Sequence, residues 1–168
     1  MAIRKKKSFG KTIGVADTMF ARGDMGGLAV KTLQDAARKR GLPVKVVRYT
    51  VPGFKDLPVA CVKLFKESKC DLVVALGMAG GAPIDEQCAF VADLGLQDVQ
   101  LKFEKHVIGV MVYAKEAKND SQLAQIMRDR TVKHCQNALD LLSDPFSLTA
   151  RAGTGQRQGG PHAGGFKI

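Results

Sequence analysis

The sequence predicts an α/β fold, in which a parallel sheet of four strands is covered by helices on both faces. The chain has 168 residues, the size of one ordinary domain, and 45% of them are hydrophobic, enough for a core. Four short apolar runs alternate with longer stretches of helical spacing. Because parallel strands need such long crossovers and hairpins do not, this alternation indicates a parallel sheet.

The first half of the chain is expected to form strand, helix, strand and helix. Residues 12–17 (TIGVAD) are typical of a short buried strand. Asp24 can cap a helix whose basic last turn is followed by the stop residue Gly41. The β-branched run 44–49 predicts a second strand. A second helix has Pro58 in its first turn, and its apolar stripe is Leu57, Ala60, Cys61, Leu64 and Phe65.

The second half repeats the pattern. Residues 71–76 (DLVVAL) are the most hydrophobic run, as expected of a central strand. A glycine-rich turn leads into a third helix over about 84–101, and 106–113 predict a fourth strand. A long helix over about 121–142 follows, with Asn119 or Asp120 as its cap. Right-handed crossovers then give a three-layer α/β/α sandwich of flavodoxin-like type.

The chain divides into a basic N-terminal tail (1–11), a single α/β domain (12–151) and a glycine-rich C-terminal tail (152–168). Residues 1–11 and 151–168 carry eight of the ten excess positive charges, so the rest of the domain is almost neutral. A nucleic-acid-binding domain usually has its basic stripe on the folded body, so no specific nucleic-acid partner is predicted. The C-terminal tail contains six glycines and is expected to be mobile or ordered only against another chain.

The sequence disfavours several classes of protein. No apolar run approaches the ~20 residues that cross a bilayer, and the basic start has no apolar continuation. The four cysteines have no close pairing such as CxxC, which favours reduced core thiols over a disulfide frame or a zinc site. We therefore expect a cytoplasmic protein that does not span a membrane. Neither a nucleophile triad nor a metal-ligand cluster is apparent.

Ligands of an open parallel sheet bind outside the carboxyl ends of the strands, so the loops at that edge form the candidate site. In the first loop, Phe20 can stack on a flat heterocycle or fold back on the core. Arg22 can bind an anion or a carbonyl, or remain solvated. In the second loop, Pro52-Gly53 form either a plain turn or a backbone surface for ligand hydroxyls. Lys55 and Asp56 can contact substrate, although a helix cap explains Asp56 equally well.

The third loop and the last helix supply weaker candidates. The glycines of that loop, which resemble a hydroxyl- or phosphate-binding turn, are Gly77, Gly80 and Gly81. Their spacing is neither GxGxxG nor a P-loop, so binding of a nucleoside triphosphate is disfavoured. Arg130 and His134 share one face of the last helix with Arg128 nearby. That face is either solvated or part of a subunit interface.

Four loop motifs occur in a fixed order along the chain: ADTMFARGDM, YTVPGFKDLPVAC, ALGMAGG and LTARAGTGQRQGG. In this order they resemble the archaeal-type riboflavin synthases. The resemblance covers residues 12 to about 160, and the first two motifs are specific. It implies a lumazine synthase-like subunit, a ring-shaped homopentamer and active sites between neighbouring subunits.

The resemblance also implies a reaction, the dismutation of two 6,7-dimethyl-8-ribityllumazine molecules. One molecule donates a four-carbon unit to the other, giving riboflavin and 5-amino-6-(D-ribitylamino)uracil. No redox cofactor is needed because the carbons move between identical molecules, and Mg²⁺ enters at most as an activator. Holding two flat heterocycles face to face can supply up to ~7–11 kcal/mol through proximity.

Residue roles follow from the same resemblance. Phe20 would stack on one ring, and Arg22 would contact ring carbonyls or the ribityl chain. The backbone of Val51, Pro52 and Gly53 would hold ribityl hydroxyls, while Gly77 and Met78 would lie under the second ring. The residues expected from the neighbouring subunit are Arg128, Arg130 or His134. The candidates for catalysis and proton transfer are Arg22, Lys55, Asp85 and Glu86, and the substrate itself can also carry the proton.

Two departures keep alternatives open. Lumazine synthases usually have a histidine near the start of the third helix, in a stretch resembling G-x-T-P-H, where this chain has GAPIDEQ. This difference argues against 6,7-dimethyl-8-ribityllumazine synthase as the alternative activity. Archaeal-type relatives can carry titratable residues where this chain has Phe90-Val91 and Tyr113-Ala114. A flavin- or lumazine-binding module without turnover is therefore the second alternative.

Overall fold

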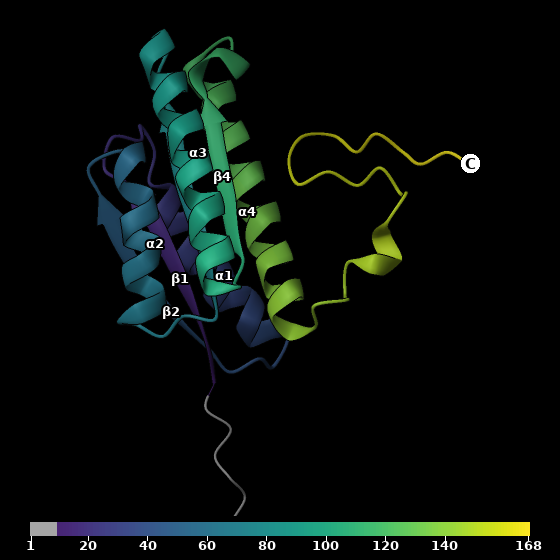
Figure 1. Cartoon of the computed structure of the whole chain (residues 1–168). Coiled ribbons are helices and arrows are strands. Elements are labelled where there is room, and N and C mark those ends of the chain that lie inside the picture. The colour runs from purple at the N-terminus through teal and green to yellow at the C-terminus, as the bar shows by residue number, and fades with distance from the viewer. Residues whose placement is uncertain (1–9) are drawn as a thin grey trace, which may run out of the picture.

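A computed structural model describes residues 10–168, and it confirms the predicted α/β architecture (Figure 1). One parallel sheet, in the order β2-β1-β3-β4, contains β1 (Lys11–Thr18), β2 (Val44–Val51), β3 (Leu72–Ala79) and β4 (Val107–Tyr113). The strands alternate with α1 (Met25–Lys39), α2 (Leu57–Lys66), α3 (Pro83–Phe103) and α4 (Asp120–Ser143). Three short 3₁₀ helices are η1 (Phe54–Asp56), η2 (Ala114–Glu116) and η3 (Thr149–Arg151).

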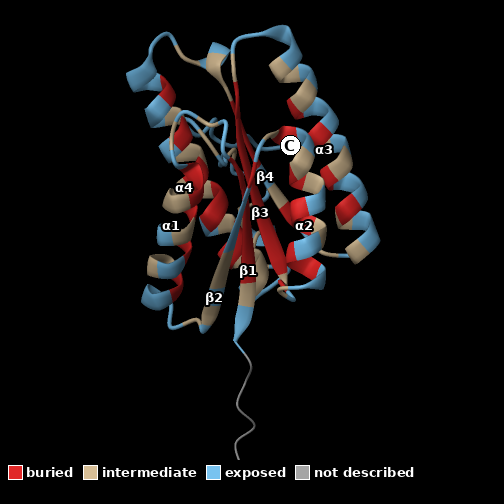
Figure 2. Cartoon of the chain, turned by 90° about the vertical axis from the view of Figure 1, so that its left-hand side faces the viewer, coloured by how far each residue is buried: buried red, intermediate tan, exposed pale blue. Residues whose placement is uncertain are grey.

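The helices form the two outer layers of the sandwich. Helices α1 and α4 cover one face of the sheet, and α2 and α3 cover the other (Figure 2). Strand β3 is buried over its whole length, as predicted for a central strand. Each face has its own apolar core, and Cys61, Cys70 and Cys135 are fully buried within these cores. The prediction of core thiols is confirmed for these three positions.

Local signals placed the helix ends correctly. The Asp24 carboxylate accepts a hydrogen bond from the Gly27 amide at 2.8 Å and caps α1. Gly41 follows α1 with a φ of +65°, a conformation that glycine adopts without strain. At the start of α4, Asn119 is the capping residue, because its side chain accepts from the Gln122 amide at 2.9 Å. Asp120 is therefore the first helical residue and its carboxylate is available for another contact.

The structure corrects the start of the glycine-rich third loop. The prediction ended the strand at Leu76, but β3 continues to Ala79. Gly77 and Met78 pair with Met111 and Val112 of β4, which supplies hydrogen-bonding partners that the local sequence does not reveal. Two residues assigned to a loop thus belong to the buried sheet.

The terminal segments differ from expectation in different ways. Of the basic segment 1–11, residues 1–9 lie outside the described residues, while Lys11 begins β1. Segment 152–168 has no helix or strand, as expected, yet it is ordered against α4 of its own chain. Lys133 Nζ donates to the Gly160 carbonyl at 2.8 Å, and the Gly160 amide donates to Asp129 at 2.7 Å. A second chain is not required to hold this segment.

Candidate functional site

The loops that leave the carboxyl edge of the sheet lie together, as predicted. The Met19 amide, just past β1, donates to the Val51 carbonyl at the end of β2 at 2.8 Å. A Cβ atom at Gly80 would lie 3.9 Å from Phe20 Cε1, so the first loop also contacts the third. Phe20 is 56% exposed and is therefore not folded back on the core. One aromatic surface remains accessible to a planar ligand.

Gly80 brings a carboxylate close to this aromatic ring. Asp85 Oδ2 accepts a hydrogen bond from the Ala82 amide at 3.2 Å, and its Cγ would lie 3.2 Å from a Cβ at Gly80. Asp85 and Phe20 thus both lie next to the same glycine. Any side chain at position 80 would clash with the Asp85 carboxylate, so glycine is needed for Asp85 to lie this close to the loop backbone.

The second loop is held by its own hydrogen bonds. The Gly53 amide donates to Asp56 Oδ2 at 3.3 Å, and Asp56 makes no side-chain cap to α2. Asp56 is the N-cap residue of α2, as predicted, but its carboxylate closes η1 and makes no capping hydrogen bond to α2. Val51 is buried at the end of β2, whereas Pro52 and Lys55 are exposed. The Gly53 amide, predicted to hold a ligand hydroxyl, already has a partner within the loop.

Gly77 and Met78 occupy core positions. A Cβ at Gly77 would lie 2.9 Å from Phe54 Cζ and 3.0 Å from its Cδ1, so this glycine makes room for the Phe54 ring. The Met78 side chain is 1% exposed and packs in the core on the α1 and α4 face. Neither residue presents a side chain at the loop surface, in contrast to the placement under a ligand ring that the sequence suggested.

Arg22 is paired rather than free. Its guanidinium donates two hydrogen bonds to Asp120, at 2.9 Å and 2.6 Å, across a groove of about 640 Å³ between the starts of α1 and α4. This pairing raises the pKa of Arg22 and lowers that of Asp120. Arg128 lines the same groove, so the structure brings two predicted residues together there. Asp120, predicted only as a possible cap, was the partner that sequence reasoning missed.

Arg130 and His134 share a face of α4 as predicted, but that face points into the molecule. Arg130 donates to both Glu116 oxygens, at 2.8 Å and 2.6 Å, and to the Met111 carbonyl at 2.6 Å. His134 is buried, and its Nδ1 lies 2.7 Å from the Arg130 carbonyl. Burial lowers the pKa of His134. A solvated face is therefore wrong for these two residues, and Glu116 was not anticipated.

Glu86 lies at the opposite edge of the sheet from the second loop. Its carboxylate forms an ion pair with Lys115 at 2.6 Å. Both residues line a groove of about 780 Å³ together with Phe90 and Tyr113. Burial raises the pKa of Tyr113, and the nearby carboxylates add to the effect. Lys115 was missed because it follows β4 and contacts α3 only through tertiary packing.

The geometry alone places limited chemistry at this edge of the sheet. Within residues 10–168, no three His, Cys, Asp or Glu side chains gather in a way that could hold a metal ion. No helix in that range is long and apolar enough to cross a membrane. The loops do offer the exposed ring of Phe20, the nearby carboxylate of Asp85 and the Arg22 guanidinium, which is paired with Asp120. Such a set suits a planar, polar organic ligand.

Comparisons with known proteins agree with this interpretation. Residues 10–144 match the 6,7-dimethyl-8-ribityllumazine synthase family. A protein named riboflavin synthase from Methanothermobacter thermautotrophicus is 43% identical over 152 residues, which cover 90% of this chain and 97% of that protein. The riboflavin synthase of Archaeoglobus fulgidus is 44% identical, with 90% and 96% covered. That of Aeropyrum pernix is 42% identical over 160 residues, with 94% and 99% covered.

Proposed function

This chain belongs to the 6,7-dimethyl-8-ribityllumazine synthase family, among its archaeal riboflavin synthases, and we propose that it forms riboflavin from two lumazine molecules bound between subunits. The observation that carries the proposal is identity of 42–44% to riboflavin synthases over nearly their whole length. The chain is thus an enzyme that transfers a four-carbon unit from one 6,7-dimethyl-8-ribityllumazine to another. The second product is 5-amino-6-(D-ribitylamino)uracil.

We assign the first bicyclic ring to the exposed face of Phe20. The ring of Phe20 is exposed and lies next to Gly80, where the missing side chain makes room for the Asp85 carboxylate. Stacking of a heterocycle on an aromatic side chain is worth about 1–3 kcal/mol by analogy with nucleic-acid bases. Because the reaction joins two identical molecules, stacking that fixes their mutual orientation also lowers the barrier.

We assign proton transfer from the C7 methyl group to Asp85 rather than to the other candidates. Glu86 is held by Lys115 in an ion pair, and Lys55 lies in η1 of the second loop rather than in the first or third loop. Asp85 lies against the same glycine as Phe20, and only its Oδ2 has a hydrogen-bond partner among the described residues. Its Oδ1 can accept the methyl proton of a lumazine stacked on Phe20 and return it later in the reaction.

The second lumazine needs a surface that residues 10–168 of a single chain do not offer next to Phe20. Arg130 and His134 are committed to internal contacts, and the 640 Å³ groove is lined by Arg22 and Arg128 but not by Phe20. We therefore propose that a neighbouring subunit completes the site, as part of a homopentamer.

No metal or redox cofactor takes part in this scheme, and added Mg²⁺ is expected to act at most as an activator. Four unpaired cysteines suit a reducing compartment, which supports the cytoplasm as its location.

A stripe on α3 supports self-association. Five apolar side chains on this helix are more than half exposed, namely Ile84, Phe90, Val91, Leu94 and Leu101. An apolar surface of this kind on a folded domain favours contact with another protein surface. Because the stripe continues from the groove beside Tyr113, the same face can hold a second copy and carry Tyr113 towards the neighbouring site.

The activity is tested by incubating the protein with 6,7-dimethyl-8-ribityllumazine, with and without Mg²⁺, and measuring both products by chromatography. We expect riboflavin and the pyrimidine in equal amounts. The F20A variant should lower kcat/KM by about 5- to 160-fold, since it removes a stacking interaction of about 1–3 kcal/mol. Phe146→Ala is the matched control, because Phe146 is exposed and lies beyond α4. Absence of riboflavin from the wild-type reaction would refute the proposal, and lumazine made from the pyrimidine and a four-carbon phosphate would favour the alternative activity.

The oligomer is tested by placing a charge on the α3 stripe. Light scattering after gel filtration should give the wild type a mass about five times the 18.1 kDa of one chain. Val91→Lys should give smaller species and lose activity, because burying an unpaired ammonium in the subunit interface is energetically unfavourable. Gln34→Lys adds the same charge at an exposed position of α1 and should leave the mass unchanged. A monomeric, fully active wild type would contradict the shared site.

A further inference from the structure

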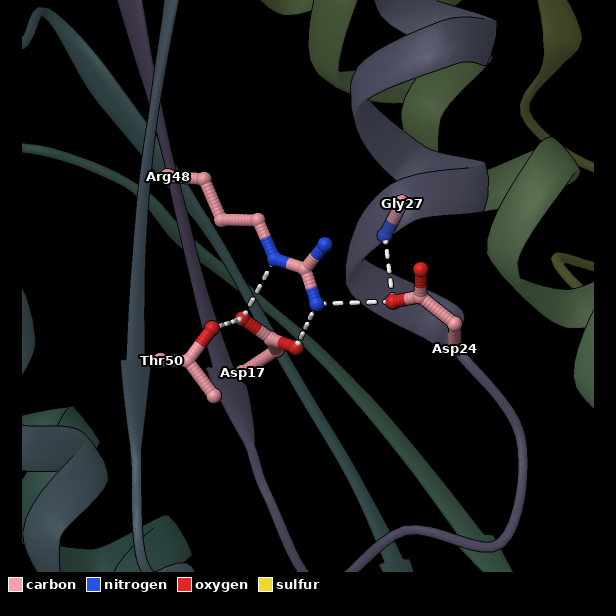
Figure 3. A network of polar contacts seen from close by, with 5 residues as sticks. All are labelled: Asp17, Asp24, Gly27, Arg48 and Thr50. Atoms are coloured by element: carbon pink, nitrogen blue, oxygen red, sulfur yellow. Dashed lines mark hydrogen bonds and ion pairs between the residues drawn. The ribbon is translucent and has the colours of Figure 1, made fainter.

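A partly buried polar network lies between the two ends of the first loop (Figure 3). Arg48, on β2, donates to Asp17 of β1 through Nε at 3.0 Å and through Nη2 at 2.7 Å. The same Nη2 donates to Asp24 Oδ1 at 2.7 Å. Thr50 Oγ1 donates to Asp17 Oδ1 at 2.8 Å. One guanidinium therefore joins two carboxylates that come from the two ends of the β1–α1 loop.

The network connects the two ends of the segment that carries Phe20 and Arg22. Asp17 is the next-to-last residue of β1, and Asp24 is the residue before α1. Between them the chain leaves the sheet and returns to the helix, so its two ends are held at a fixed separation by Arg48. The Met19 amide bond to Val51 adds a second tie near the first end. The exposed ring of Phe20 sits on a short loop whose ends are both fixed.

The residues around Arg48 leave room for its guanidinium and pair with its charge. A Cβ at Gly26 would lie 2.6 Å from Arg48 Nε and 2.5 Å from Asp17 Cγ, so only glycine lets the first turn of α1 pack onto the network. The Asp17 side chain is only 6% exposed, whereas that of Asp24 is 66% exposed. A buried carboxylate needs a charged or hydrogen-bonding partner, and Arg48 and Thr50 provide both.

We propose that Arg48 is a positioning residue, which fixes the two ends of the β1–α1 loop so that the Phe20 ring is placed to stack on the lumazine. The inference rests on the proposed function for its consequence in catalysis. An arginine suits this role because its planar fork donates to two carboxylates at once, whereas a lysine ammonium lacks that fixed geometry. A misplacement of about 1 Å in a reacting group can cost about 100-fold in rate, so a loop fixed at both ends matters for turnover.

The decisive variant is Asp24→Ser. Serine is as good a helix cap as aspartate, so α1 keeps its bond to the Gly27 amide, but the shorter side chain does not reach Arg48. We expect kcat/KM to fall 5- to 20-fold and the amides of residues 19–23 to exchange with deuterium at least 5-fold faster. Asp35→Asn is the matched control: it removes one carboxylate that pairs with Arg38 at 3.5 Å on α1, and neither measurement should change.

A double-mutant comparison separates positioning from general stability. Arg48→Lys should lower kcat/KM more than Asp24→Ser, but in the F20A background the further loss should be less than 2-fold, since the ring to be positioned is gone. Unchanged exchange of residues 19–23 in Asp24→Ser would overturn the inference, as would equal losses from Arg48→Lys with and without Phe20. If Arg48→Lys does not fold, Asp24→Ser decides alone. If the wild type makes no riboflavin, the proposed function fails, while the exchange data still test whether Arg48 fixes the β1–α1 loop.

Discussion

Arg130→Met is expected to lower the free energy of unfolding by about 2–3 kcal/mol, because it leaves Glu116 without its main partner. The side chains of Arg130 and Glu116 are 22% and 30% exposed, so water only partly replaces the lost bonds. Arg130 also donates to the Met111 carbonyl at the end of the sheet. Methionine fills much of the space of the arginine stem but donates no hydrogen bond. Urea unfolding followed by circular dichroism measures the change.

Arg128→Met is the control for this variant. Arg128 lies two residues earlier on α4, is exposed, and has no polar partner within residues 10–168. The charge change is the same, but the loss should stay below about 0.5 kcal/mol. Equal losses from the two variants would show that net charge, and not the Glu116 pair, is responsible.

The same pair predicts an acid response. The hydrogen bonds from Arg130 hold the pKa of Glu116 below its ordinary value of 4.5. Its contribution to stability is therefore complete above pH 4.5 and is lost as the pH falls through the lowered value. In Arg130→Met this acid dependence should weaken, because only the Tyr113 amide still donates to Glu116, whereas Arg128→Met should keep it in full.

Gly77→Ala is expected to destabilise the fold by about 1–3 kcal/mol and to lower activity as well, because the added methyl group meets the Phe54 ring. Three ring atoms lie within 3.0 Å of the new carbon. Gly77 belongs to β3 and is paired with β4, so the strand cannot easily move away. Phe54 begins η1, and its displacement would carry Gly53 and the rest of the second loop with it. Thermal unfolding and kcat/KM are the two measurements.

A neighbouring glycine and a compensating change make this test specific. Nothing lies within 4 Å of a Cβ at Gly81, so Gly81→Ala should change stability by less than about 0.5 kcal/mol. Phe54→Leu in the Gly77→Ala background should recover part of the loss by removing ring atoms. A wild-type unfolding temperature for Gly77→Ala would refute the packing argument.

Much of the site was predictable because loop position follows from strand order. Once four strands alternate with helices, Phe20 and Gly80 must lie at one edge of the sheet, and the structure brings them there. The ion pairs were not predictable. Asp120 is 98 residues from Arg22 in the sequence, and no local pattern distinguishes it from a solvated residue at the start of a helix. Glu116 and Lys115 were missed for the same reason.

The sequence by itself determined the elements, their order, the parallel sheet and the family. Apolar periodicity, helix caps and turn residues act over a few neighbouring positions, so they are visible in one dimension. Tertiary structure alone decided which charges are paired, that β3 extends through Gly77 and Met78, and that the C-terminal segment lies along α4. Each of these depends on a partner distant in the chain, and such partners meet only when the sheet and its two layers of helices have packed.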